Sequence, residues 1–262
     1  MNKTRFYNMI DFRYFNDLVF VLTKKDIKSR YKTSVLGYLW SIINPLAFAA
    51  IFYVIFQVVM RFDMQNYALF LVTGLFTWQW INNSANAGAM IFIQNASLIK
   101  KIIFPRSILP LSIVLQDAFH FLMSVPVIIV LLLIFDKTPS WNWFIGIPIL
   151  LVIQCTLTYG LSLLLASINL FFRDVEKITG LLFTALFYMT PILFPISKIP
   201  EDYRIYILLN PFTPIVIAWR ELFIDGIIFS KYTLYSFGYA ILFLIVGVVV
   251  YRKLRWKFAE VL

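Results

Sequence analysis

The sequence predicts an all-α integral membrane protein with six transmembrane helices, an N-terminal amphipathic interface helix and a re-entrant helix pair between spans five and six. Of its 262 residues, 61% are hydrophobic and 14% are charged, and the mean hydropathy is +0.83, whereas soluble domains are about 45–50% apolar and about 25% charged. The apolar runs are long and do not alternate, so they predict helices and not barrel strands. With six spans, 17 of the 23 Lys and Arg residues fall on one side, which predicts that both termini are cytoplasmic.

Residues 13–34 are expected to form an amphipathic helix on the cytoplasmic membrane surface. Thr23 and Asp26 resemble a capping box that would restart this helix. Basic residues such as Lys28 and Arg30 follow, and charge alone favours an anchor on anionic lipid over a docking site for a cytoplasmic partner. The apolar residues that recur at i, i+3, i+4 and i+7 are Phe15, Leu18, Val19 and Leu22.

The second span is unusual because amide side chains cluster at its centre. Gln79, Asn82, Asn83 and Asn86 cannot be satisfied by lipid, so they must face other helices or a water-filled path. The six spans are expected at residues 36–60, 68–92, 107–135, 143–170, 179–195 and 233–251, with cytoplasmic loops at 94–106 and 170–178.

The segment between spans five and six is apolar but broken by prolines. One short helix is expected to begin near residue 200, where a proline precedes two acids, and to end at Asn210-Pro211. A second is expected to have Thr213 as its N-cap and Gly226 as its C-cap. Neither approaches the roughly 20 residues that cross a membrane. A seventh span would move the basic tail outside, so we expect two helices that dip into the outer leaflet and return.

The chain is therefore interpreted as a single transmembrane domain. Its parts are the interface helix (1–35), spans one to five (36–195), the re-entrant pair (196–232), span six (233–251) and a cytoplasmic tail (252–262). The sequence contains no P-loop and no Cys/His cluster, so we expect no catalytic, cofactor or metal site on this chain. The net charge of +10 is attributed to the cytoplasmic loops and not to nucleic-acid binding.

Several segments along the chain can be compared with a known pattern. They are KSRYKTSVLGYLW (28–40) with Asn44-Pro45, LIKKIIFP (98–105) with Leu109-Pro110, FFRD (171–174), Thr190-Pro191, and Asn210-Pro211 followed by Arg220 and Leu222-Phe223. In this order they resemble segments of the permeases in ABC exporters for bacterial cell-surface polysaccharides. The similarity covers the chain from about residue 15 to its end.

This resemblance implies export of a lipid-linked glycan, such as O-antigen, capsular polysaccharide or teichoic acid, across the bacterial inner (plasma) membrane. It implies a homodimer of this permease with two separate ATP-binding subunits, which would hold ATP and Mg. It also makes docking the preferred role of the N-terminal helix. The residues expected to contact the ATPase are Lys28, Arg30, Tyr31, Lys100, Lys101, Arg173 and Asp174.

Aromatic residues form stripes at i, i+4 spacing in spans one and five, and aromatic rings can stack on the apolar faces of sugars. In a chain with 18% aromatic residues, phenylalanine facing lipid is the ordinary alternative. The resemblance favours a substrate path, because these two spans line the conduit in the family. The path residues are Trp40, Asn44, Phe48, Phe52, Phe56, Phe183, Phe187 and Tyr188, and the expected gate residues are Asn210, Pro211 and Arg220, with Arg220 near the outer interface.

Two alternatives stay open, and a third is disfavoured. The chain could be an ABC permease for a non-glycan lipid or a drug. It could be a secondary carrier in which Asp117 and His120, spaced i, i+3 in the third span, relay protons, although a hydrogen-bonded structural pair is favoured. A membrane enzyme acting on lipid-linked sugar would need paired acids near one membrane face, which the sequence lacks.

Overall fold

The computed structural model describes residues 12–31 and 36–258, and the regular structure in these two ranges is entirely helical. In chain order the elements are α2 (Phe12–Tyr31), the 3-10 turn η1 (Gly37–Leu39), α3 (Trp40–Tyr53), the π-helical η2 (Val54–Val59), α4 (Tyr67–Gln94), α5 (Ala96–Lys101), α6 (Ile108–Ile134), α7 (Trp143–Asn169), α8 (Asp174–Met189), the turn η3 (Ile196–Lys198), α9 (Glu201–Leu208), α10 (Thr213–Arg220), the π-helical η4 (Glu221–Asp225), α11 (Lys231–Leu254) and the turn η5 (Arg255–Lys257).

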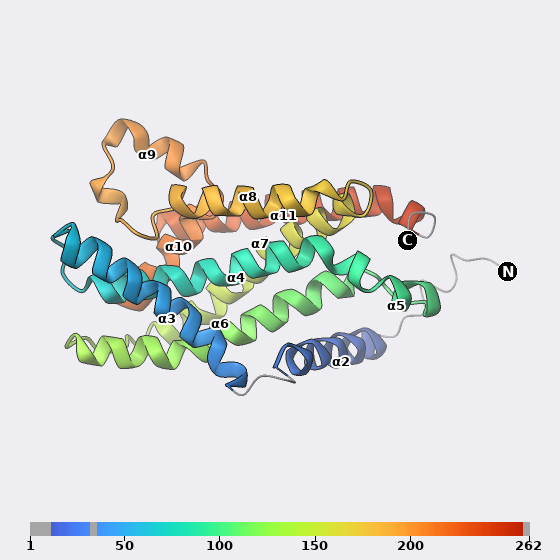
Figure 1. The fold of residues 1–262 in the computed structure, drawn as a ribbon, viewed down its shortest axis with the longest axis horizontal. Helices are drawn as coiled ribbons and strands as arrows, with labels where there is room; N and C mark the ends of the chain where they lie inside the picture. The colour runs from blue at the N-terminus through green and yellow to red at the C-terminus, as the bar shows by residue number, and fades with distance from the viewer. Residues whose placement is uncertain (1–11, 32–35, 259–262) are drawn as a thin grey trace.

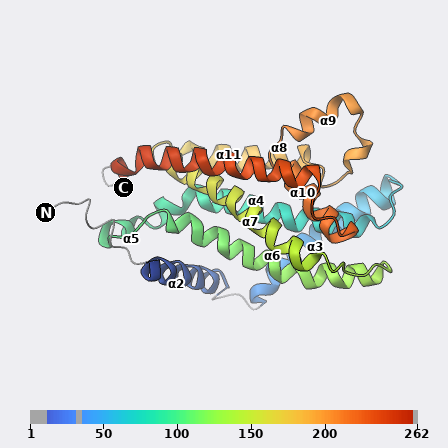
Figure 2. The same cartoon turned by 180° about the vertical axis from the view of Figure 1, so that it is seen from behind.

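The two ends of the bundle carry different elements. The long helices α4, α6, α7, α8 and α11 run side by side along the longest axis (Figure 1). Both views show α2 and α5 toward the end where α11 finishes, and α9 with α10 toward the opposite end (Figures 1 and 2). We call these the α5 end and the α9 end.

Within the described ranges, four helical stretches are long and apolar enough to cross a membrane. They are Trp40–Val59, Ile108–Ile134, Trp143–Asn169 and Lys231–Lys257, and they lie where spans one, three, four and six are predicted. α4, which is 28 residues long, coincides with the predicted second span. The chain is thus a multi-pass, all-helical membrane protein.

α4 lies at the centre of the bundle, because it contacts α3, α6, α7, α8 and α10. The most extensive packing joins α7 to α11, where Gly160 faces Gly247. A Cβ atom on either glycine would overlap the backbone of the other helix. Small residues at such crossings let helix backbones approach closely in a membrane.

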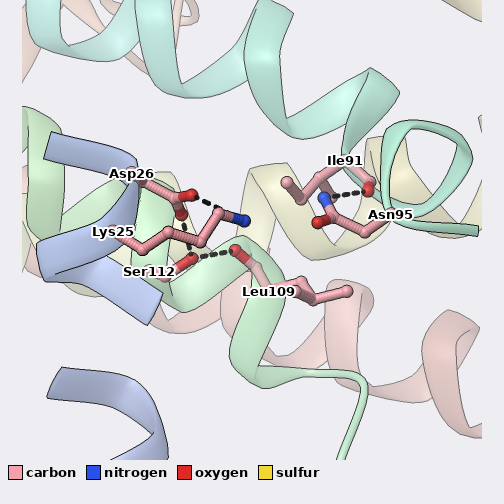
Figure 3. Close-up of polar contacts among 6 residues, drawn as sticks. All are labelled: Lys25, Asp26, Ile91, Asn95, Leu109 and Ser112. Atoms are coloured by element: carbon pink, nitrogen blue, oxygen red, sulfur yellow. Dashed lines mark hydrogen bonds and ion pairs between the residues drawn. The ribbon is translucent and has the colours of Figure 1, made fainter. Parts of the chain in front are cut away.

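α2 is one continuous helix, so the expected restart at Thr23 is wrong. The Asp26 carboxylate accepts a hydrogen bond from the Ser112 hydroxyl of α6 at 3.0 Å and pairs with Lys25 at 3.4 Å (Figure 3). A carboxylate held this way by a neighbouring helix does not cap its own backbone. The expected apolar stripe is confirmed, because Phe15, Leu18, Val19 and Leu22 all belong to a hydrophobic cluster with α4, α6 and α7.

α8 begins earlier than the predicted span five, which was expected from residue 179. Asp174 and Glu176 lie in its first turn, where negative charges stabilise the N-terminus of a helix. The Asn169 side-chain oxygen also accepts a hydrogen bond from the Glu176 backbone N–H at 3.0 Å. The charged segment predicted as a loop is therefore mostly the start of α8. The helix ends at Met189, and Thr190 is extended (φ −91°, ψ 140°), as expected before Pro191.

The segment between α8 and α11 contains two short helices, as the prolines predict. α9 and the α10–η4 helix meet at an angle of 104°. The Asn210 side-chain oxygen accepts the Phe212 backbone N–H at 3.0 Å. Thr213 is inside α10 and Phe212 precedes it, so the predicted threonine cap is wrong. The predicted C-cap at Gly226 is confirmed by its left-handed backbone (φ 69°).

Candidate functional site

A groove of about 490 Å³ runs between α3, α4 and α8, and we call it the aromatic groove. Positions i and i+4 lie on one face of a helix. Phe48 and Phe52 therefore face the groove from α3, and Phe183 and Phe187 face it from α8. The other lining residues are Asn44, Pro45, Leu75, Trp78, Gln79, Asn82, Asn83, Thr184 and Tyr188.

Ring contacts connect the three walls of the aromatic groove. The Phe52 ring centroid lies 6.5 Å from that of Phe48 and 5.8 Å from that of Phe187. Trp78 of α4 lies 5.9 Å from both Phe183 and Phe187. Rings separated by about 4.5–7 Å attract one another. Together they form a continuous aromatic surface.

Most of the residues predicted for a substrate path meet in this groove. They are Asn44, Phe48, Phe52, Phe183, Phe187 and Tyr188. Phe56 does not reach it, because its ring packs against Phe62 and Tyr67 at 6.5 and 6.3 Å. Trp40 lines a neighbouring pocket instead.

Amide side chains of α4 form the polar side of the groove. Gln79, Asn82 and Asn83 line it, and the Asn86 amide donates to the Asn82 side-chain oxygen at 2.9 Å. The sequence predicts that these amides face protein or water. The same signal could have identified them as site residues. Trp78 was missed, because the sequence does not distinguish a groove tryptophan from a core one.

A smaller pocket of about 90 Å³ lies between α3, α4 and α6, and we call it the polar pocket. Its lining residues are Trp40, Ser41, Asn44, Phe76, Gln79, Trp80, Asn83, Asp117, His120 and Phe121. The Ser84 hydroxyl donates to Asp117 Oδ2 at 2.8 Å, and the Ser162 hydroxyl donates to the Ser84 carbonyl at 2.7 Å. These bonds join α6, α4 and α7, as expected for a helix-to-helix polar link.

Arg220 does not lie at an exposed interface, so the prediction for its surroundings is wrong. Its side chain is buried, and its guanidinium lies 3.4 Å from the centroid of the Phe70 ring. It donates to the Pro191 carbonyl at 3.0 Å and to the Phe70 carbonyl at 3.3 Å. Gly74 provides the space, since a Cβ there would lie 2.6 Å from Arg220 Nη2. Buried charges need such partners, and the backbone break at Pro191 supplies one.

Two more side chains hold the residues after α8. The Tyr67 hydroxyl donates to the Leu193 carbonyl at 2.8 Å, and the Asn210 amide donates to the Thr190 hydroxyl at 2.8 Å. Together with Arg220 they form what we call the outer clamp. Two of the three predicted gate residues, Asn210 and Arg220, thus attach the α9–α10 region to the end of α8.

The residues predicted to contact an ATPase belong to elements at the α5 end. Their exposed members are Lys28, Lys100, Lys101, Arg173 and Asp174. The side chains of Arg30 and Tyr31 are outside the described part of the structure. α2 and α5 share one hydrophobic cluster, to which Leu22 and Ile99 contribute.

The aromatic groove suits an extended molecule with both apolar faces and hydroxyl groups. Rings contact the faces, and a few placed amides orient the polar groups. Within residues 12–31 and 36–258, no group of three His, Cys, Asp or Glu side chains could hold a metal ion.

The chain matches known proteins along most of its length. Residues 17–224 match the family described as ABC-2 type transporter. The chain is 46% identical to an O-antigen export system permease protein RfbA of Klebsiella pneumoniae, over 95% of this chain and 96% of the relative. It is 32% identical to the protein of that name from Myxococcus xanthus, over 80% and 82%. It is 26% identical to the polysialic acid transport protein KpsM of Escherichia coli, over 87% and 90%.

Proposed function

Because the chain belongs to the ABC-2 type transporter family, we propose that it is the transmembrane subunit of an ATP-driven exporter of lipid-linked polysaccharide. The cargo is of the O-antigen, capsule or teichoic-acid type, and it moves outward from the cytoplasmic side of the bacterial inner membrane. The observation that carries this proposal is the 46% identity over 95% of the chain to an O-antigen export permease. The aromatic groove supports it with a surface suited to sugars.

The proposed topology has six spans and places the α5 end in the cytoplasm with both termini. Four of these spans are the helical stretches that are long and apolar enough to cross a membrane, and α4 and α8 are the other two. The 28 residues of α4 extend about 42 Å at 1.5 Å per residue, which exceeds the hydrocarbon core. The excess of Lys and Arg in the segments at that end supports the orientation. In this topology α9 and α10 are a re-entrant pair on the outer side, within a single permease domain.

The proposed assembly is a homodimer of this chain with two ATP-binding subunits, which hold ATP and Mg. The ATPases dock on α2, α5 and the start of α8, where Lys100, Lys101 and Asp174 are exposed. In this assembly the separate ATPase subunits supply the energy for export, since this chain has no P-loop.

In the proposed path, the glycan passes along the aromatic groove and leaves near the outer clamp. Phe48 and Tyr188 are 57% and 59% exposed in this chain, so they are available to contact a cargo. Asn210 and Pro211 form the hinge of the gate, and Arg220 fixes the gate helix to α8.

The experiment removes this chain from a strain that makes the polysaccharide and its ATPase. We expect surface polysaccharide to disappear and lipid-linked polymer to accumulate inside, with both effects reversed by the wild-type chain. The wild-type chain should also purify with the ATPase and with glycan bound. Normal surface polysaccharide in the deletion strain would reject the proposal.

A further inference from the structure

The polar pocket opens beside the aromatic groove and shares part of its wall. Asn44 of α3 and Gln79 and Asn83 of α4 line both spaces. Gln79 and Asn83 are one helical turn apart, so their amides form a short edge between the two. A molecule in the groove can extend a side group past this edge into the pocket.

The far wall of the polar pocket carries fixed hydrogen-bonding groups. Asp117 and His120 lie one turn apart on α6 and are 3% and 8% exposed. The bond from Ser84 at 2.8 Å holds the Asp117 carboxylate in one orientation. A carboxylate provides about four acceptor positions. Being held by Ser84 is therefore compatible with accepting a hydrogen bond from a ligand hydroxyl.

Aromatic rings form the other walls. Trp40 of α3 and Trp80 of α4 line the pocket, with Phe76 and Phe121 beside them. Trp40 is 44% exposed, whereas Trp80 is 2% exposed and packs 5.3 Å from Phe121. An aromatic wall beside amide and carboxylate groups complements a sugar substituent that has both apolar C–H groups and a hydroxyl.

We propose that the polar pocket is a subsite that receives one hydroxyl-bearing substituent, such as a hydroxymethyl group, of a sugar unit that lies in the aromatic groove. The pocket, at about 90 Å³, is much smaller than the groove, at about 490 Å³. A cavity of about 150 Å³ holds one benzene ring, so the pocket admits a substituent of a sugar and not the whole ring. This inference rests on the proposed export function.

The test places the photocrosslinker p-benzoylphenylalanine at one of three positions. Position 40 reports on the polar pocket, and position 188 reports on the aromatic groove. Position 144 is the control, because Phe144 is 75% exposed on α7 and lines neither space. The glycan is held in the chain by a partner ATPase that cannot hydrolyse ATP. After illumination, crosslinked chains are detected on gels by a glycan stain.

We expect crosslinks from positions 40 and 188 but not from 144. In the same chains, Asp117→Asn should lower the crosslinked fraction at position 40 about tenfold, the effect of one hydrogen bond to a charged group, and change position 188 less than about twofold. Thr158→Val is the matched control, because the Thr158 hydroxyl is buried but bonds its own helix at Gln154. It should change neither fraction.

The outcomes separate the subsite from the export function. Crosslinks at 188 without crosslinks at 40 would overturn the subsite and leave the export function standing. Crosslinks at neither position would overturn both. An equal loss at 40 and 188 in Asp117→Asn, with unchanged thermal stability, would also overturn the subsite, because Asp117 would then act on the whole path.

Discussion

Arg220 joins three parts of the α9 end through backbone carbonyl groups. Its guanidinium bonds Pro191 after α8 and Phe70 in α4, while its own backbone belongs to α10. The Pro191 carbonyl lies beyond the end of α8 and accepts no helical hydrogen bond. Arg220 therefore provides the donor that this carbonyl would otherwise lack. The residue is thus a structural tie as well as a predicted gate member.

At this scale we predict that Arg220→Met destabilises the protein. The Pro191 carbonyl would lose its charged donor, and an unsatisfied buried group of this kind costs about 1–3 kcal/mol. The Phe70 carbonyl would keep the Thr73 hydroxyl as a donor at 3.1 Å. Arg204→Met is the control. Arg204 also donates to backbone carbonyls, those of Ile199 and Ser197, but its side chain is 36% exposed, so water can replace these bonds. Its pair with the exposed Glu201 contributes about 1 kcal/mol or less. Thermal unfolding in one detergent, followed by tryptophan fluorescence, measures both. Equal melting temperatures for the two variants would show that the tie is unimportant.

At the scale of helices, the α7–α11 crossing depends on glycine. We predict that Gly247→Ala lowers the free energy of unfolding by about 1–3 kcal/mol, because the added methyl group overlaps Gly160 of α7. Gly238→Ala on the same helix is the matched control: no atom lies within 4 Å of its Cβ position. That change should be neutral or stabilise by up to about 1 kcal/mol, the helix preference of alanine over glycine. Unfolding in detergent distinguishes the two, and equal effects would contradict the close crossing.

The α9–α10 pair should show a sharp accessibility boundary. Leu209 is 66% exposed, whereas Phe212 and Val216 are 2% and 0% exposed. In a chain with Cys155 replaced, we predict that L209C reacts with a membrane-impermeant thiol reagent added outside and that F212C and V216C do not. If the α9–α10 pair is a gate, trapping the ATPase with ATP should make F212C and V216C reactive. Labelling that ignores nucleotide would leave a fixed surface pair and no gate.

At the scale of the whole molecule, the proposed assembly supplies energy at the α5 end, and we expect it to reach the α9 end along α8. This helix begins with the exposed Asp174 and is followed by the outer clamp. We predict that Asp174→Ala preserves membrane insertion but uncouples ATP hydrolysis from export, so that the ratio of polymer exported to ATP hydrolysed falls. Glu176→Ala, two residues further along the same first turn, tests whether any carboxylate at the helix start or Asp174 specifically matters. Normal export with Asp174→Ala would show that this segment only connects two spans and has no role in coupling.

Hydropathy alone predicted where the long helices lie, because lipid requires long apolar runs whatever their partners are. The errors occur where a distant residue decides the local structure. Asp26 does not form the expected capping box with Thr23, and its carboxylate instead accepts a hydrogen bond from Ser112 of α6. Arg220 is buried because a break 29 residues earlier offers it a carbonyl. The aromatic stripes identified most of the groove, but periodicity could not reveal that Phe56 packs on Tyr67.

The outer clamp also orders the biosynthesis of the protein. Arg220 is synthesised 29 residues after its partner Pro191, a delay of roughly 1.5–6 s at typical ribosome speeds. Until then, the end of α8 has carbonyls that neither lipid nor its own helix can satisfy. We therefore expect the nascent chain to keep this end in the aqueous vestibule of the insertion machinery until α10 arrives. Ribosomes stalled before residue 220 should hold α8 at the translocon, and those stalled after α11 has emerged should not.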